Sequence, residues 1–278
     1  MLSISAMRTP RFIVIVLLLV SAAAVRAIAW GAEGHRVVAR VAWSQMTDAA
    51  KHAAQRLLGE EDFVTSSNWA DEIRSGRPET YNWHFVDIPY DAKTYDAARD
   101  CKPTEKGDCI IAELTRAQHA VGDASLPIDQ RKEALKFLIH FVGDLHQPLH
   151  TIDNQDLGGN KVHLTIGGRT TNLHAVWDTG IINMKPMGEA AYAASLIEDL
   201  KAHPLGSEKI DYVAWALEGH KIAVESAYMF PGATTAAATQ GTVLSLEEKY
   251  ETDRLSIVDR QLELAGARLA LVLNSALR

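Results

Sequence analysis

Two histidine–aspartate pairs have the spacing of metal ligands. His140 and Asp144 stand four residues apart, and His174 and Asp178 repeat that spacing further along the chain. Residues four apart share one face of an α-helix, so each pair can direct an imidazole nitrogen and a carboxylate oxygen at one ion. His150 follows shortly after the first pair and can return a third ligand to the same helix end. These residues predict a site for divalent metal ions.

The sequence around His140 is strongly apolar, which separates this pair from an ordinary surface ion pair. A single pair on an exposed helix is more often solvated than bound to metal. His140, however, stands within Phe137–Val142, whose other members are all apolar. A buried imidazole and carboxylate need partners, and a metal ion supplies them. The pairs therefore indicate metal and leave the substrate open.

Two further segments place an acid or a histidine among aromatic and apolar neighbours. Asp71 lies in Asn68–Arg74, and His84 lies in Asn82–Asp87. Taken alone, Asp71 could cap a helix and His84 could be a packed core residue. Histidines with no recognisable partner are expected on surface or helix faces: His52, His119, His203 and His220. His146 could support the metal site or simply pack.

Helical periodicity covers most of the chain. Thr47 can cap a helix that stops at Gly59, and Pro127 opens a segment that Pro148 ends. Ser245 with Glu248 resembles a capping box before a long amphipathic run. The sequence therefore predicts helices over residues 47–58, 111–122, 128–146, 187–202, 208–229 and 245–277.

One stretch has the alternation of a β-hairpin. Lys161–Ile166 alternates polar and apolar residues and is followed by Gly167 and Gly168. No other segment is a persuasive strand, and no break has the length of an interdomain linker. The prediction is a mainly α, single-domain protein with a small hairpin.

The amino-terminal residues 1–29 have the pattern of a cleavable secretory signal. Arg8 and Arg11 precede the apolar run Phe12–Val20, and Ala27–Ala29 ends the segment with the A-x-A pattern of a cleavage site. The alternative is a membrane anchor, but the run is shorter than the roughly 20 residues that a spanning helix needs. We expect a mature protein of residues 30–278, periplasmic or secreted, without stable membrane association.

The charge of the chain speaks against a polyanionic substrate. The formal net charge is −7, and a leader with three arginines and no acidic residue would leave −10 after its removal. Affinity for phosphate backbones usually comes from lysine and arginine. Bound divalent cations would reverse this balance locally.

The chain has two cysteines, Cys101 and Cys109, close together in a polar stretch. In an exported protein they are expected to form a disulfide that pins a surface loop, with free thiols as the alternative. A cysteine-based metal site is not expected, because two thiols supply too few ligands.

Several motifs, in this order, together resemble the S1/P1 nuclease family. They are Trp30–His35, Trp69–Asp71, Trp83–Phe85, His140–His150, Gly158–Asn160 and Asn172–Asp178. The combination is specific, because candidate ligands recur in order at compatible spacings. The resemblance implies one helical catalytic domain over residues 30–278, with a fold that is shared with zinc-dependent phospholipase C.

The resemblance also implies three zinc ions and the residues that hold them. The first ion would be bound by Asp71, His84, His140 and Asp144, and the second by His150, His174 and Asp178. The third would be bound by the amine and carbonyl of Trp30, by His35 and by a shared Asp144. An amine inside a peptide bond cannot bind metal, so the third ion would require cleavage before Trp30.

The same resemblance assigns substrate contacts. Asp71, Arg74 and Asn160 would act at the scissile phosphate, with Arg74 offsetting the charge of the transition state. Phe85 could stack on a nucleobase and Asp87 could accept hydrogen bonds from its edge, although core packing is the alternative for Phe85.

The implied activity is zinc-dependent hydrolysis of single-stranded DNA and RNA to 5′-phosphate products, together with hydrolysis of 3′-nucleotides. No protein partner is expected. A zinc-dependent phospholipase C is the alternative within the same fold. A non-catalytic exported zinc-binding protein is the alternative of another class, and it would have no need for Arg74.

Overall fold

The computed structural model describes residues 30–206, 208–232 and 242–278. The predicted leader, residues 1–29, lies outside the described residues. Within the described ranges, no helix combines the length and the apolar character that a membrane crossing requires.

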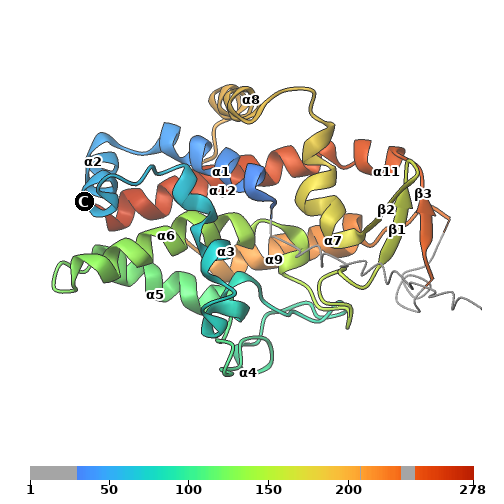
Figure 1. Ribbon diagram of the computed structural model, residues 1–278, viewed down its shortest axis with the longest axis horizontal. Coiled ribbons are helices and arrows are strands. Elements are labelled where there is room, and N and C mark those ends of the chain that lie inside the picture. The colour runs from blue at the N-terminus through green and yellow to red at the C-terminus, as the bar shows by residue number, and fades with distance from the viewer. Residues whose placement is uncertain (1–29, 207, 233–241) are drawn as a thin grey trace, which may run out of the picture.

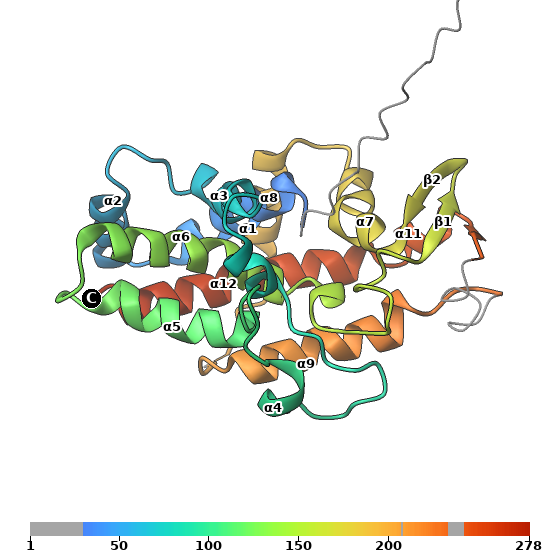
Figure 2. The same ribbon diagram turned by 60° about the horizontal axis from the view of Figure 1, so that its bottom comes forward.

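A body of long helices forms the core. In Figure 1 these helices run side by side, and α8 (Glu189–Ala202), seen nearly end-on, packs against one side of α1. The long helices are α1 (Ala32–Gln45), α5 (Ile110–Gly122), α6 (Ile128–Leu145) and α12 (Leu255–Ala276). The C-terminus lies at one end of this body and the small sheet at the other, in both views (Figures 1 and 2).

Helix α6 is the central element for function. It begins after Pro127 and ends at Leu145, close to the predicted range. Every residue from Ala134 to Leu145 is buried, because α1, α2, α5 and α12 pack around the helix. Polar groups of this stretch are therefore removed from water and must find partners inside the protein.

Other helical predictions are confirmed as well. Helix α2 (Asp48–Leu58) begins where Thr47 Oγ1 accepts a hydrogen bond from Ala50 N at 3.2 Å. The expected segment 208–229 contains α9 (Tyr212–Ile222), which continues into the π-helical turn η6 (Ala223–Ala227). Helices α5 and α8 match their predicted ranges.

The hairpin is present, and it is part of a three-stranded sheet. Strands β1 (His163–Ile166) and β2 (Arg169–Asn172) pair antiparallel, and Gly167 and Gly168 take positive φ in the turn. A third strand, β3 (Leu244–Leu246), pairs parallel to β1.

The predicted capping role of Ser245 was wrong. Ser245 lies in β3, between the buried Leu244 and Leu246, so it alternates outward as a strand residue. The helical run begins later, with α11 (Lys249–Thr252), and its long part, α12, starts at Leu255. Pairing with β1 outweighs the local capping signal.

Short helical turns connect the long helices and carry most of the chemically interesting residues. The turns at the candidate site are η1 (Thr65–Asn68), α3 (Trp69–Ile73), η2 (Pro78–His84), η3 (Pro148–His150), α7 (Leu173–Ala175) and the π-helical η4 (Val176–Gly180). Two more lie elsewhere, α4 (Ala97–Asp100) and η5 (Ile182–Met184).

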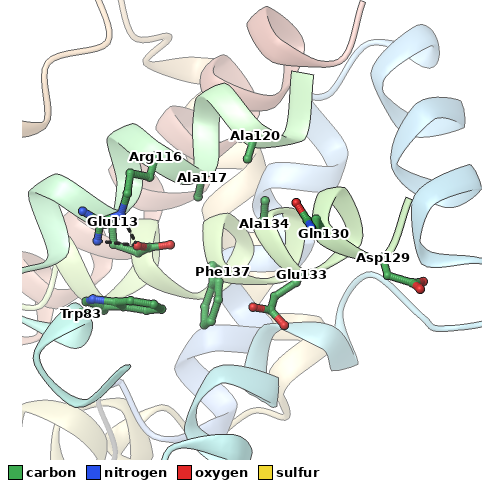
Figure 3. Close-up of a pocket in the computed structure, with 10 residues that line it drawn as sticks. All are labelled: Trp83, Glu113, Arg116, Ala117, Ala120, Asp129, Gln130, Glu133, Ala134 and Phe137. Carbon is green, nitrogen blue, oxygen red and sulfur yellow. Dashed lines mark hydrogen bonds and ion pairs between the residues drawn. The ribbon is translucent and has the colours of Figure 1, made fainter. Parts of the chain in front are cut away.

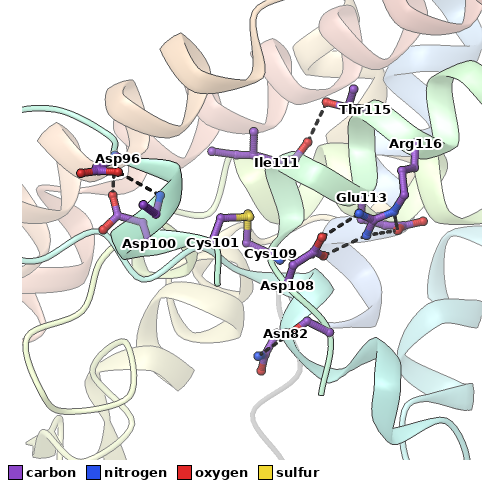
Figure 4. The surroundings of a disulfide bond; sticks show 12 residues. Asn82, Asp96, Asp100, Cys101, Asp108, Cys109, Ile111, Glu113, Thr115 and Arg116 are labelled. Carbon is purple, nitrogen blue, oxygen red and sulfur yellow. Dashed lines mark hydrogen bonds and ion pairs between the residues drawn. A yellow bond between two sulfur atoms is a disulfide. The ribbon is translucent and has the colours of Figure 1, made fainter. Parts of the chain in front are cut away.

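The disulfide between Cys101 and Cys109 is present, with Cα atoms 5.0 Å apart. It joins the end of α4 to the start of α5 and closes a surface loop between them (Figure 4). The expected pairing is confirmed.

Candidate metal centre

Histidine and aspartate side chains from distant parts of the chain meet beside α6. Three groups each bring candidate ligand atoms within 4.8 Å of one another. The groups are His35, His140 and Asp144; Asp71, His84 and His140; and His150, His174 and Asp178. All histidine and aspartate residues that the sequence analysis singled out as ligands are therefore brought together.

Asp144 lies at the centre of this arrangement. Its Oδ2 is 3.0 Å from His84 Nδ1 and 3.1 Å from His140 Nε2. Its Oδ1 is 3.3 Å from His35 Nε2. Because its two oxygens face different histidines, one carboxylate can serve two neighbouring ions, as the resemblance implied.

Helix α1 approaches α6 closely enough to add His35 to the cluster. The His35 ring stacks on His140 with ring centroids 3.9 Å apart. Gly143 makes this possible, since a Cβ at that position would stand 3.1 Å from His35 Nδ1. Trp30 is fully buried, and its Nε1 donates to Gly143 O at 2.8 Å.

The third group lies beyond the C-terminal end of α6. His174 Nε2 is 3.2 Å from Asp178 Oδ2, and the His150 and His174 rings stack at 5.1 Å. Gln147 Nε2 donates to Asp178 Oδ1 at 2.5 Å, which leaves Oδ2 turned toward the histidines. Gln147 is an orienting residue that the sequence analysis missed, although it stands inside the quoted motif His140–His150.

Backbone carbonyls fix the orientation of three rings. The Nδ1 atoms of His140, His150 and His174 lie 2.6–2.7 Å from Ser67 O, His84 O and Gly158 O. A carbonyl can only accept, so each Nδ1 carries a proton, and in the neutral ring the Nε2 atom offers a lone pair. Such outer contacts are typical of metal-binding histidines, whose tautomer they set.

The buried polar atoms that lack partners are concentrated at this cluster. Among the described residues, eight buried side-chain atoms have no hydrogen-bond partner. They belong to His35 (both ring nitrogens), Asp71, Arg74, His84, Asp144, His150 and Asp178. Native proteins rarely leave such atoms unsatisfied, so the pattern calls for a ligand. Nitrogen and oxygen donors without thiolate suit zinc.

Burial sets the protonation of the candidate ligands. Desolvation lowers the pKa of His84, His150 and His174 to about 4, so these rings are neutral and able to bind metal at neutral pH. Against desolvation, the charges of Asp144 and Asp71 raise the pKa of His140 to about 9.

The pKa values of the two buried carboxyls, Asp144 and Asp178, are shifted in opposite directions. Burial opposes ionisation of Asp144, but His140, His35 and His84 hold its pKa well below the usual range. Burial raises the pKa of Asp178 well above the usual range, against the hydrogen bond from Gln147. A cation at Asp178 would replace the proton that this carboxyl otherwise keeps, so metal binding there would release a proton.

Arg74 faces the cluster from the end of α3. Burial is the main cause of the lowered pKa of His84, His150 and His174, and the positive charge of Arg74 lowers it further. Its Nη2 donates to Tyr81 O at 3.2 Å, while its buried Nε has no partner. A planar guanidinium with free donors is suited to bind a phosphate.

Asn160 lies at the end of a tight turn that touches the third group. Asp156 Oδ1 accepts from Gly159 N, and Gly158 O accepts from the His174 ring. Gly158 has φ +58°, and a Cβ there would meet Leu149 O at 2.4 Å. The Asn160 side chain is partly exposed and donates to Leu157 O at 2.9 Å, which leaves its amide oxygen free in the turn.

Phe85 and Asp87 follow His84 along an extended segment. Hydrogen bonds from Val86 N to His150 O and from Asp153 N to Ile88 O hold this segment beside the third group. Phe85 is half-buried and Asp87 is exposed. Desolvation by surrounding atoms, and then the charges of Asp153 and Asp100, raise the pKa of Asp87 to about 6.

Two histidines, His220 and His146, lie outside the cluster, and the structure shows the partners of both. His220 lies on a helix, within the expected surface or helix faces, but it is buried and has a partner that was not recognised: its Nε2 donates to Pro89 O at 3.0 Å. His146 donates from Nδ1 to Val142 O and accepts from Arg268 at Nε2. It packs on Trp215. His146 therefore packs in a separate polar cluster.

Comparison with known proteins agrees with this geometry. The family described as S1/P1 Nuclease matches residues 30–278. The chain is 31% identical to Nuclease P1 of Penicillium citrinum over 88% of this chain and 97% of the relative. It is 31% identical to Endonuclease 2 and 33% identical to Endonuclease 4 of Arabidopsis thaliana, over 88–89% of this chain and 89% of each relative. The chain belongs to the S1/P1 nuclease family.

Proposed function

We propose that this chain is an exported zinc-dependent endonuclease. It hydrolyses phosphodiester bonds of single-stranded DNA and RNA, leaves 5′-phosphate products, and also removes phosphate from 3′-nucleotides. The observation that supports this most strongly is the set of buried, unpartnered donor atoms around Asp144. A structural cluster would pair these atoms internally, whereas a catalytic metal centre leaves them for ions and substrate.

Three zinc ions are proposed, held by the sets that the family resemblance implies. Asp71, His84, His140 and Asp144 would hold one ion, and His150, His174 and Asp178 another. His35, Asp144 and the amino-terminal Trp30 would hold the third. When bound, zinc lowers the pKa of a water molecule toward about 7 and so provides a nucleophile at neutral pH.

The remaining residues prepare the substrate. Arg74 carries a charge and unpartnered donors toward the place where a phosphate must lie to reach the ligands, and it would stabilise the extra negative charge of the transition state. Asn160 would contact a phosphate oxygen, and Asp71 would position the reacting group. Phe85 and Asp87 would contact the base, which requires an unpaired strand.

The decisive experiment uses the mature chain beginning at Trp30. Single-stranded DNA should be cut by the purified protein, cutting should stop with EDTA and return with zinc, and the protein should contain about three zinc ions. The 5′-ends of the products should carry phosphate, and 3′-adenylate should release phosphate.

Other outcomes separate the alternatives. Three zinc ions with hydrolysis of phospholipid vesicles, but not of DNA, would identify a phospholipase C instead. Zinc without turnover of any phosphodiester would indicate a non-catalytic zinc protein. Protein with little zinc would contradict the metal centre itself.

Export is tested separately. The exported protein should begin at Trp30 by amino-terminal sequencing, because cleavage after Ala29 removes the predicted leader. A form that keeps residues before Trp30 should bind one ion fewer. Full activity and three zinc ions in that form would contradict the proposed role of the Trp30 amine.

A further inference from the structure

The exposed aromatic ring of Tyr81 contacts two positively charged side chains, those of Arg74 and Lys106. The Tyr81 side chain is 44% exposed, although it lies only three residues before His84. The Arg74 guanidinium carbon is 4.1 Å from the centroid of the Tyr81 ring, and Lys106 Nζ is 5.3 Å from the same centroid. Phe85 meets the ring edge-on at 6.1 Å. We call Arg74, Tyr81 and Lys106 the cationic strip.

Lys106 reaches this position because its loop is held firmly. The disulfide closes the loop at its base, and Asn82 N donates to Lys106 O at 2.8 Å. Gly107 has φ +95° and lies so close to Trp83 that a Cβ would meet Trp83 Nε1 at 2.6 Å. The backbone at residue 106 is therefore fixed against η2, the same turn that carries Tyr81 and His84.

Salt bridges tie the far side of the loop to α5. Asp108 accepts two hydrogen bonds from Arg116, at 2.6 and 2.8 Å, and Arg116 also pairs with Glu113 (Figure 4). The hydrogen bond from Asn82 N to Lys106 O holds the loop at a second place. The loop is thus anchored on both sides.

The cations of the strip differ from the neighbouring arginines in that no carboxylate of the described residues pairs with them. Arg77 pairs with Glu79 and Glu133, and Arg116 pairs with Asp108 and Glu113. Arg74 and Lys106, in contrast, form no ion pair with a carboxylate of the described residues, and both side chains contact Tyr81. In a chain of net charge −7, neighbouring cations without acidic partners favour an anionic ligand.

A nearby groove of about 450 Å³ between α5 and α6 is a poorer place for such a ligand. Trp83 and Phe137 give it an aromatic lining, but Glu113, Glu133 and Asp129 surround them (Figure 3). The one arginine in its lining, Arg116, already pairs with two carboxylates. A phosphate would be repelled there, so the strip and not the groove is the better candidate for a nucleic-acid backbone.

We propose that the cationic strip binds the nucleotide next to the scissile phosphate. Lys106 pairs with its backbone phosphate, and the exposed part of Tyr81 contacts its base. Arg74, at the inner end of the strip, remains at the scissile phosphate. This inference rests on the proposed nuclease function and extends it: the enzyme gains affinity from polynucleotides that a single 3′-nucleotide cannot provide.

The test compares an oligonucleotide with a 3′-nucleotide in the metal-loaded enzyme. For Lys106→Ala, the ratio of kcat/KM on a ten-residue oligothymidylate to that on 3′-adenylate should fall about fivefold at low salt, since one exposed ion pair is lost. The slope of log(kcat/KM) for the oligonucleotide against log[salt] should become shallower by about 0.7, which is the effect of one phosphate contact on a single strand.

Lys102→Ala is the matched control. Lys102 is exposed on the same disulfide loop, but the lysine that contacts the Tyr81 ring is Lys106. Its removal should change neither the ratio nor the salt slope. If Lys106→Ala and Lys102→Ala give the same kcat/KM ratio and the same salt slope, the proposed phosphate contact of Lys106 is refuted.

Tyr81 variants test the aromatic part. Tyr81→Phe keeps the ring and should keep the oligonucleotide KM near that of the parent, whereas Tyr81→Ala should raise it. Equal KM values for Tyr81→Ala and Tyr81→Phe would overturn the base contact. A parent enzyme that cuts no DNA would overturn the proposed function as well, whereas an active parent with unresponsive variants overturns only the strip.

Discussion

Helix α6 contributes to two buried histidine clusters that differ in one respect. At the metal centre, His140 and Asp144 lie among buried atoms without hydrogen-bond partners. Two residues beyond Asp144, His146 is equally buried, but both of its ring nitrogens are partnered, by Val142 O and by Arg268. Arg268 in turn pairs with Glu208 and Glu218.

The difference shows what identifies a functional site in this molecule. Burial of a histidine is common to both clusters, and so is the neighbourhood of charge. Of the two clusters, only the candidate metal centre leaves ring nitrogens and carboxylate oxygens unpartnered, and such buried atoms lower the stability of a fold unless a ligand pairs with them. The predictions below test this contrast, from the largest expected effect to the smallest.

Removing the central carboxylate should have the largest effect. Asp144→Ala should lose bound metal and lower nuclease activity by more than about 100-fold, because even a supporting residue of a metal site contributes 10–100-fold. Metal analysis and a single-strand cleavage assay measure both. His146→Gln, at the C-cap position just after the same helix, is the control and should keep its metal and activity. Similar metal loss in both variants would remove the distinction between the clusters.

Substitution of Arg74 should lower kcat and leave the metal content unchanged. Arg74→Lys should keep the metal content and lower kcat by about 10²–10³-fold, since a lysine cannot reproduce the planar donors aimed at the developing charge. Arg77→Lys, three residues later in a surface salt bridge, should leave kcat unchanged. An Arg74→Lys enzyme with normal kcat would place the phosphate elsewhere.

Two glycines with similar backbone angles should respond differently. Gly158→Ala would push against Leu149 O and displace the carbonyl that orients His174, so zinc affinity should fall about 10–100-fold. Gly168→Ala strains a turn with φ +78°, but a Cβ there meets nothing within 4 Å. Competition with a chelator measures the affinities; equal values for both variants would refute the role of the Gly158 carbonyl.

The partnered cluster should appear in the pH dependence of stability. Desolvation and the charge of Arg268 lower the pKa of His146 to about 3, from 6.5. Its contribution to stability is therefore complete above pH 6.5 and is lost as the pH falls toward 3. Over that interval the free energy of unfolding of the parent should fall more steeply than that of His146→Gln, by up to about 1.4 kcal/mol per pH unit.

Denaturant titrations at several pH values provide this measurement for the metal-loaded proteins. The comparison of slopes removes the constant difference in stability between the two chains. Parallel curves would mean that His146 keeps an ordinary pKa, and the contrast between the two clusters would then rest on hydrogen bonding alone.

Much of this architecture could be predicted from local patterns. The helix of His140 and Asp144 is bounded by Pro127 and Pro148, and the hairpin turns at Gly167 and Gly168, so sequence signals and structure agree there. Helix α1 was not predicted. It begins at Ala32, and the preceding N-cap residue, Gly31, has no side chain to make a capping hydrogen bond, so no start signal was visible.

Other features depend on contacts that sequence spacing does not contain. Ser245 and Glu248 have the pattern of a helix start, yet the parallel pairing of β3 with β1 draws Ser245 into a strand. His220 acquires its partner from Pro89, which lies 131 residues away. The cationic strip depends on contact between the turn η2 and the disulfide loop, and no sequence motif predicts this contact.

Trp30 has a practical consequence for making the enzyme. Its side chain is wholly buried and its indole is fixed to α6 through Gly143, so the proposed start of the mature chain is held against α6. A purification tag at this end would leave extra residues in front of Trp30 after the tag is cleaved off. The Trp30 amine would then be part of a peptide bond and could not bind zinc as proposed. Tags belong after the exposed Arg278, at the far end of α12.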